Sequence, residues 1–492
     1  MTAYLKRLVS SLAAYQVADV VSKFIAVLLL PVYTRFIAPS GYGVGELLAN
    51  GVILISILVR AGIIESFLRF YFSDDDAARR DALTRRSVRV LLVSTTIAAL
   101  GLAAAATPLS RLVLGYPDPT TFRIAVLGVW AFTNLELAYA VLRVDERLRT
   151  YATASLINVG LTVGASLALV VGLGKGARGL LLGNYGASTV VLLGLWWTMR
   201  ARLLGSGGRA GEGHAALLRF GLPTVPAEAS VYALSIVDRY YIFHGQSPRL
   251  AGLYSIAVKL AGSVAFIVRA FQYAWPPLAY SVRDDAEAAR LYGLVTTYYL
   301  LVSGLVVAGL ALLGRWVLRL LAAPAYYGAY KALPWVALGW ALYGLWVVFM
   351  VIAGRAKVTT RNFPAALAGL AANVIMLLIL VPALGIAGAG IALCGAYVVM
   401  IAVMHMLTRR AFAASFEWRR LVQLVLVLGG LAAAGDVLLP TRGVVGLATR
   451  ALVLAAMPFV LLATGFAHRQ EVEQGRALLR RAARRGVAGE PA

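Results

Sequence analysis

The sequence has 492 residues, of which 61% are hydrophobic and only 14% are charged. A soluble core could not bury this much apolar surface. Apolar runs of about 20 residues recur along the chain, the length that a helix needs to cross roughly 30 Å of hydrocarbon. The composition therefore excludes an ordinary soluble domain and predicts an all-α integral membrane protein.

The formal net charge of +24 would suggest nucleic acid as a partner of a soluble protein. Here most Lys and Arg fall in alternate connections between apolar runs, as the positive-inside rule predicts for cytoplasmic loops. No nucleic-acid partner is therefore expected. The single cysteine, Cys394, excludes a disulfide framework and a cysteine-based metal site, and the four histidines show no ligand spacing. Neither a metal nor another cofactor is expected.

The first apolar stretch, residues 15–43, contains charged residues where a lipid anchor would have none. Asp19 and Lys23 lie deep inside it, Pro31 follows, and Arg35 lies near its far end. A charge at the centre of a bilayer costs roughly 2.5–3.5 kcal/mol, so such residues normally face protein or a water-filled cavity. The stretch also lacks a small-residue cleavage site. We therefore interpret it as the first span and as part of a pore wall.

Thirteen further spans are expected in chain order. They lie near residues 45–64, 90–106, 122–142, 152–173, 179–199, 220–243, 251–278, 292–313, 332–353, 364–381, 386–407, 421–439 and 446–467. Basic connections occur near 69–89, 143–149, 200–219, 283–290, 355–361 and 409–420. About fourteen spans with both termini in the cytoplasm is the simplest arrangement.

An internal repeat divides the chain into two halves. Arg60 and Arg269 are separated by 209 residues, and so are Asp75 and Asp284. Because each half has an even number of spans, the repeat is parallel, and the interface between the halves is the expected binding site. The predicted domains are two six-helix bundles, two additional helices and a basic cytoplasmic tail, at residues 1–205, 215–410, 420–467 and 468–492. The arginine-rich tail is expected to contact anionic membrane lipids.

Several charged side chains on the predicted spans cannot be explained by contact with lipid. The cations are Lys23, Arg60, Arg239, Lys259 and Arg269, with Arg35 at the edge of the first span. The acids at comparable depth are Asp19, Glu46, Glu136, Glu228 and Asp238. We expect the cations to exceed what local acids neutralise, which predicts a positively biased central cavity that binds a phosphate or pyrophosphate group.

Structural explanations for the same charges remain open. Asp238 and Arg239 are adjacent, and Asp19 and Lys23 are one helical turn apart, so each pair could form an ion pair that holds helices in register. Arg35, Arg60 and Arg269, near span ends, could extend to the lipid headgroups. Asp19, Glu46 and Glu228 are candidate sites for a coupling proton or cation.

Motifs along nearly the whole chain resemble the bacterial polysaccharide exporters, the O-antigen-type flippases of lipid-linked oligosaccharides. In the first half these are Ser22-Lys23, Pro31-Val32-Tyr33-Thr34-Arg35, Pro39 and Tyr42-Gly43. In the second half they are Asp238-Arg239, Gly252, Tyr254-Ser255, Ala257, Lys259, Pro276-Pro277, Asn373, Pro382 and Gly385-Ile386-Ala387-Gly388-Ala389.

The resemblance implies the multidrug/oligosaccharidyl-lipid/polysaccharide exporter fold, in which two six-helix bundles surround a central cavity. It implies that the chain moves an undecaprenyl-pyrophosphate-linked glycan across the bacterial inner membrane by alternating access, with polysaccharide polymerase machinery as a candidate partner. It also makes six cations candidate contacts of the pyrophosphate or of acidic sugars: Lys23, Arg35, Arg60, Arg239, Lys259 and Arg269.

Three alternatives remain. The two additional spans are similar to those of the lipid II flippases, which are sister proteins. A cation-coupled multidrug exporter would share the fold, but its substrates would favour carboxylates in the cavity. A membrane glycosyltransferase or polymerase would be an enzyme acting on the same lipids. Such enzymes generally carry catalytic acids on a sizeable outer loop, and no predicted outer loop exceeds about twenty residues. We therefore expect a transporter and not an enzyme.

Overall fold

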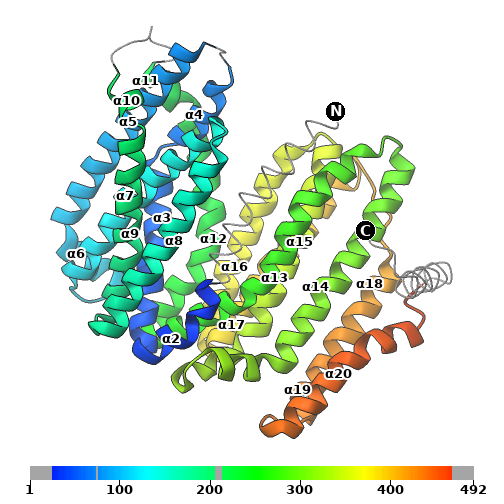
Figure 1. Cartoon of the computed structure of the whole chain (residues 1–492). Helices are drawn as coiled ribbons and strands as arrows, with labels where there is room; N and C mark the ends of the chain where they lie inside the picture. Colours follow the sequence, from blue (N-terminus) through cyan, green and yellow to red (C-terminus); the bar gives the residue numbers. More distant parts are fainter. Residues whose placement is uncertain (1–24, 74–75, 206–212, 468–492) are drawn as a thin grey trace, which may run out of the picture. The chain divides into compact units, whose positions relative to one another are not determined.

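The computed structural model describes residues 25–73, 76–205 and 213–467. Every regular element in these ranges is helical (Figure 1). The chain folds as two compact units. The first contains the described residues up to Leu260, together with Leu318–Ala332 and Leu370–Leu393; the second contains Ala261–Val317, Leu333–Gly369 and the described residues from Cys394. The bundle boundary at residues 205–215 is inferred from the repeat and stays a prediction.

The first unit contains most of the N-terminal helices. They are α2 (Leu30–Phe36), α3 (Pro39–Val59), α4 (Ile63–Tyr71), α5 (Ala77–Ala104), α6 (Ala106–Leu114), α7 (Pro119–Val144), α8 (Leu148–Leu167) with a π-helical turn at Ala168–Gly172, α9 (Gly176–Thr198), α10 (Arg200–Leu204), α11 (His214–Gly221) and α12 (Val225–Gly245). The long helix α13 (Pro248–Ser281) begins in the first unit and continues in the second.

The remaining helices lie wholly or partly in the second unit, and most of α16 belongs to the first. They are α14 (Asp285–Leu321), α15 (Leu333–Arg355), α16 (Asn362–Leu384), α17 (Ile386–Thr408), α18 (Trp418–Leu424), a π-helical turn at Val425–Gly429, α19 (Gly430–Leu438) and α20 (Gly443–Ala463). Short 3₁₀ segments lie at Leu222–Thr224, Pro324–Lys331 and Thr359–Arg361.

Within the described residues, 12 helices are long and apolar enough to cross a membrane. Helix α12 is not among them, since Glu228, Asp238 and Arg239 lower its apolar content. At 1.5 Å per residue its length is about 31 Å, which still matches the hydrocarbon thickness. Together with the first span, of which the structure describes the part that includes α2, the helices agree with the predicted count of about fourteen. The protein is an all-α, multi-pass membrane protein.

Helix α7 lies at the centre of the first unit. In its apolar window 67% of the residues are buried, against 17% in α5 and in α8. Small side chains such as Ala131 and Ala140, both 0% exposed, allow neighbouring helices to approach α7 closely. The outer face of α5 carries exposed side chains such as Ile97, 65% exposed. We expect that face to contact acyl chains.

The N-terminal ends of α3 and α13 cross through a symmetric pair of glycines. A Cβ atom on Gly43 would lie 2.2 Å from the carbonyl oxygen of Pro248, and a Cβ atom on Gly252 would lie 1.9 Å from that of Pro39. Pro39 and Gly43 are separated from Pro248 and Gly252 by the same 209 residues as the sequence repeat. The two copies of the motif therefore pack against each other through equivalent atoms, as a pseudo-twofold arrangement requires.

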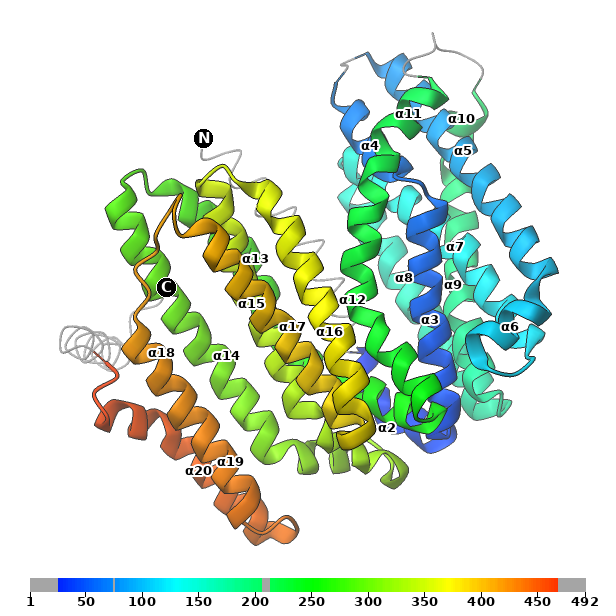
Figure 2. The same ribbon diagram turned by 180° about the vertical axis from the view of Figure 1, so that it is seen from behind.

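The two additional helical spans pack along α14 in the second unit (Figures 1 and 2). The side chain of Arg450 on α20 is 0% exposed and donates to the carbonyl oxygens of Leu312, Asp436, Leu439 and Pro440 at 3.1–3.3 Å. Helix ends leave carbonyl groups without intrahelical partners. Arg450 satisfies those at the end of α19 and thereby joins α19 and α20 to α14.

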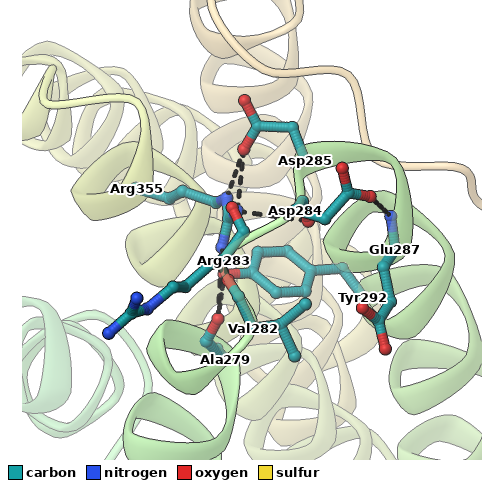
Figure 3. Close-up of polar contacts among 8 residues, drawn as sticks. All are labelled: Ala279, Val282, Arg283, Asp284, Asp285, Glu287, Tyr292 and Arg355. Carbon is teal, nitrogen blue, oxygen red and sulfur yellow. Dashed lines mark hydrogen bonds and ion pairs between the residues drawn. The ribbon is translucent and has the colours of Figure 1, made fainter.

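A second arginine holds the connection between α13 and α14 (Figure 3). Arg355, at the end of α15, donates to the Asp285 carboxylate at 2.7 and 3.0 Å and to the carbonyl oxygens of Val282 and Arg283 at 2.8 and 3.1 Å. In the sequence analysis, Arg355 was part of the basic connection at residues 355–361, which was explained by the positive-inside rule alone. Its contacts give it a structural role as well, because it caps the last turn of α13.

The glycine crossing yields a stability prediction. Gly43→Ala and Gly252→Ala should each lower the free energy of unfolding by about 1–3 kcal/mol, because each new methyl group meets backbone that cannot rotate away. The measurement is the thermal unfolding midpoint of purified protein in detergent. Gly101→Ala is the matched control, since Gly101 lies in helix α5 and a Cβ atom there would have nothing within 4 Å; it should be neutral or stabilising. Equal midpoints for all three variants would contradict the packing.

Candidate functional site

Helix α3 carries a row of polar side chains along one face. Tyr42, Glu46 and Asn50 are spaced four residues apart, so they lie above one another on the same side of the helix. The face is directed at α12 and the first part of α13, all within the first unit. A polar row of this kind inside an apolar helix marks a surface that does not contact lipid.

Lys259 of α13 binds the beginning of this row. Its ammonium group forms an ion pair with the Glu46 carboxylate at 2.6 Å and donates to the Tyr42 hydroxyl at 2.5 Å. The same nitrogen lies 4.9 Å from the centre of the Tyr42 ring. The side chain of Lys259 is 36% exposed, whereas that of Glu46 is 14% exposed. The pair is therefore compensated in charge, and Lys259 keeps an accessible surface.

Arg239 of α12 binds the next turn of the same row. Its guanidinium donates to the Asn50 side-chain oxygen at 3.2 Å, and the Tyr232 hydroxyl donates to the same oxygen at 3.2 Å. The neighbouring acid, Asp238, is 3% exposed and accepts a hydrogen bond from the hydroxyl of Tyr254 on α13. The two adjacent charges thus contact different helices, with Arg239 bound to α3 and Asp238 bound to α13.

Arg60, at the end of α3, lies among three carboxylates. Its guanidinium pairs with Glu136 of α7 at 2.8 Å, with Glu65 of α4 at 3.5 Å, and with Glu228 of α12. Arg60 is 8% exposed. One cation therefore links four helices, and the four charges together carry an excess of negative charge.

The expected excess of positive charge is not found in this network. Its cations are Arg60, Arg239 and Lys259, and its acids are Glu46, Glu65, Glu136, Glu228 and Asp238. The sequence analysis named all of these acids except Glu65, and three of its six cations, Lys23, Arg35 and Arg269, are not among the members of this network. Partners such as Arg60 and Glu228, 168 residues apart, become neighbours only when the helices cross.

The predicted site residues separate into three groups. Arg60, Arg239, Lys259, Glu46 and Glu228 all lie along α3 in the first unit. Arg35 is exposed at the end of α2, and Arg269 is exposed on the part of α13 that belongs to the second unit. Lys23 and Asp19 lie outside the described residues. Their roles stay predictions.

Sequence reasoning did not single out Asn50 and Glu65, and it treated Glu136 only as one acid at membrane depth. A signal for Asn50 exists, since it follows Glu46 by one helical turn and precedes Lys259 by the repeat distance of 209 residues. Within the described ranges, no group of three or more His, Cys, Asp or Glu side chains could hold a metal ion.

A family described as polysaccharide biosynthesis protein matches residues 32–330, more than half of the chain and all of the helices that form this network. The chain belongs to this family. The match covers both copies of the Pro-Gly motif at the α3–α13 crossing. No curated protein sequence matches the chain.

Solved structures with the same fold are flippases and transporters. The lipid II flippase MurJ in an inward closed conformation is 12% identical, with a TM-score of 0.70 over 93% of this chain and 99% of that one. An inward-facing multidrug resistance MATE family transporter of the MOP superfamily is 14% identical, with a TM-score of 0.62 over 78% and 94%. A mutant of the Vibrio cholerae MATE transporter VcmN is 13% identical, with a TM-score of 0.53 over 82% and 93%. At these identities the likeness establishes the fold.

The Arg60 cluster yields a prediction about the stability lost when its carboxylates are left without a cation. Arg60→Met should lower the free energy of unfolding by about 3–5 kcal/mol, because it leaves three carboxylates without their cation. Adding Glu136→Gln and Glu228→Gln to Arg60→Met should recover part of the loss. The measurement is the thermal unfolding midpoint in detergent.

The control for this experiment is Arg111→Met, which removes an exposed arginine at the end of α6 and should leave the midpoint unchanged. If the two glutamine substitutions lower the midpoint further in the Arg60→Met background, Arg60 does not hold these carboxylates in the way described.

Proposed function

We propose that the protein is a flippase that moves an undecaprenyl-pyrophosphate-linked oligosaccharide from the cytoplasmic to the outer leaflet of the bacterial inner membrane. The single observation that supports this most is the placement of Arg239 and Lys259, on two different helices, against one polar face of α3. Membership of a polysaccharide biosynthesis family makes a lipid-linked glycan the natural cargo.

The chemistry of this face suits a pyrophosphate followed by sugars. Arginine offers two parallel donors to a phosphate, and lysine offers a mobile point charge. The Asn50 side-chain oxygen accepts hydrogen bonds from Arg239 and from Tyr232, so an arriving phosphate would compete with this neutral oxygen for the Arg239 guanidinium. At Lys259 the phosphate would take the place of the Glu46 carboxylate. The sugar hydroxyls would then find amide and phenol partners along the same row.

We further propose that the displaced carboxylates couple transport to a proton or cation. Glu46 and Glu228 each neutralise a cation of the network. A carboxylate that loses its cation inside a membrane is costly unless it binds a proton or another cation. If Glu46 released Lys259, or Glu228 released Arg60, the freed carboxylate would therefore bind a proton or another cation. Lys23, Arg35 and Arg269 stay candidate contacts of the headgroup, and Asp19 stays a candidate coupling residue.

In the proposed cycle the headgroup passes between the two repeat halves by alternating access while the lipid tail stays in hydrocarbon. The α3–α13 crossing at Gly43 and Gly252 would have to separate for the cargo to leave at that end. Both termini would be cytoplasmic, with the basic tail on anionic lipids, and polysaccharide polymerase machinery is a proposed partner. No chemical step on the glycan is proposed, so the protein would not be an enzyme.

The test is transport of a fluorescent polyprenyl-pyrophosphate glycan in proteoliposomes. Wild-type protein should move the glycan between leaflets, and Arg239→Ala combined with Lys259→Ala should slow the initial rate by roughly tenfold or more, since two charge-assisted contacts are lost. Arg111→Ala is the control and should match the wild type. Absence of transport by the wild-type protein, or full activity of the double variant, would contradict the proposal.

A second candidate, an exporter of organic cations, is favoured by one observation. Three carboxylates surround Arg60, and a cationic substrate would be attracted to such a cluster. The same proteoliposomes distinguish the two functions when they are loaded with ethidium. Export of ethidium that is lost in Glu136→Gln combined with Glu228→Gln, without movement of the glycan, would establish the second function.

A further inference from the structure

The α3–α13 crossing adjoins a segment from a distant part of the chain. The 3₁₀ segment Pro324–Lys331 lies between α14 and α15 in sequence, yet it belongs to the first unit. A Cβ atom on Gly328 of this segment would lie 3.2 Å from Cδ1 of Leu253. Leu253 directly follows Gly252 of the crossing. The segment therefore packs on the beginning of α13.

Tyr326 attaches this segment to the connection between α2 and α3. Its side chain is 0% exposed, and its hydroxyl donates to the carbonyl oxygen of Ile37 at 2.7 Å. Just before the segment, the N–H group of Ala323 donates to Thr34 Oγ1 at 2.9 Å. Ile37 caps the end of α2, where carbonyl groups lack intrahelical partners, and it precedes Pro39 of the crossing by two residues. Tyr326 supplies the partner of that carbonyl group.

Tyr42 lies between Tyr326 and the ammonium group of Lys259. The rings of Tyr42 and Tyr326 meet edge to face, with their centres 5.9 Å apart and their planes at 84°. The Tyr42 hydroxyl accepts a hydrogen bond from Lys259 at 2.5 Å. Tyr42 is 1% exposed, whereas the Lys259 side chain is 36% exposed. Three side chains in contact thus connect an accessible cation to the carbonyl group of Ile37.

A ligand at Lys259 would act on these contacts from their accessible end. Because Tyr42 is buried, a phosphate on the exposed part of Lys259 would draw the ammonium group away from the Tyr42 hydroxyl. A buried hydroxyl that loses its partner is destabilised, and the contact of the ammonium with the Tyr42 ring would weaken as well. The position of Tyr42 against Tyr326 would then become less favourable.

We propose that Tyr42 is a positioning residue that transmits the arrival of a phosphate-bearing ligand at Lys259 to Tyr326. Tyr326 then releases the Ile37 carbonyl group, and the α3–α13 crossing opens. The inference rests on the proposed transport function and adds to it the step that makes opening depend on cargo. The contacts hold the crossing closed while Lys259 pairs with Glu46, and they release it when a phosphate replaces that carboxylate.

The test measures opening through a cysteine placed beside this contact. In a Cys394→Ser background, Ile37→Cys keeps the backbone carbonyl that Tyr326 binds and introduces a thiol at a buried position. Its rate of reaction with a membrane-impermeant thiol reagent is measured in detergent, with and without a fluorescent polyprenyl-pyrophosphate glycan. The glycan is saturating, so that a change in affinity does not enter. It should raise the rate by about tenfold, within the usual range of coupling between two sites.

Two variants should change different quantities. Tyr326→Phe loses the hydrogen bond to Ile37 and should raise the rate without glycan by about fivefold, the scale of one hydrogen bond. Tyr42→Phe keeps a ring against Tyr326 and near Lys259 but removes the hydroxyl, so the increase caused by the glycan should fall to about twofold. Tyr327→Phe, the matched control in the same 3₁₀ segment, changes a partly exposed tyrosine and should match the background in both quantities.

Three outcomes would overturn the proposal. If immobilised protein retains the fluorescent glycan but the glycan does not change the reaction rate, the coupling is wrong while the proposed transport function stands. If Tyr42→Phe and Tyr326→Phe both raise the rate without glycan and both keep the full increase with it, the two tyrosines only pack. If the background protein does not retain the glycan, the proposed function fails and the coupling fails with it; the retention measurement separates this outcome from the first.

Discussion

The structure depends on one constraint, which is that a charge within hydrocarbon must find its partner inside the protein. In the described part of the first unit, helix α3 provides partners for two cations and carries a third at its end. Glu46 binds Lys259, Asn50 binds Arg239, and Arg60 at its end binds carboxylates from three other helices. The polar face of α3 thereby fixes the positions of α12 and the beginning of α13.

The repeat explains why these partners meet. The glycine contacts at the α3–α13 crossing are equivalent in both copies of the motif, so the crossing brings one polar helix face against another. Asn50 and Lys259 occupy equivalent places in the two copies, 209 residues apart. A neutral amide in one half and a cation in the other create an asymmetric site from a symmetric frame. In the proposed function, such a site would hold the charged end of a long ligand in one orientation.

The sequence predicted the membrane class, the approximate number of spans and the repeat, because these follow from apolar run length and from residue spacing. It also singled out the charged residues of the network along α3, except Glu65. It could not identify their partners, since Arg60 and Glu136 are 76 residues apart and meet only through the packing of α3 on α7. It did not indicate that Asp238, next to Arg239 in sequence, also accepts a hydrogen bond from Tyr254 on another helix.

The most direct test of the account is the water accessibility of the polar face of α3. In a Cys394→Ser background, single cysteines at Asn50 and Tyr232 should react with a membrane-impermeant thiol reagent, and a polyprenyl-pyrophosphate glycan should slow that reaction. Ile97→Cys, on the exposed apolar face of α5, should react only with a lipid-soluble reagent. If the cysteines at Asn50 and Tyr232 react like the one at Ile97, the polar face is a dry structural contact and no headgroup passes along it.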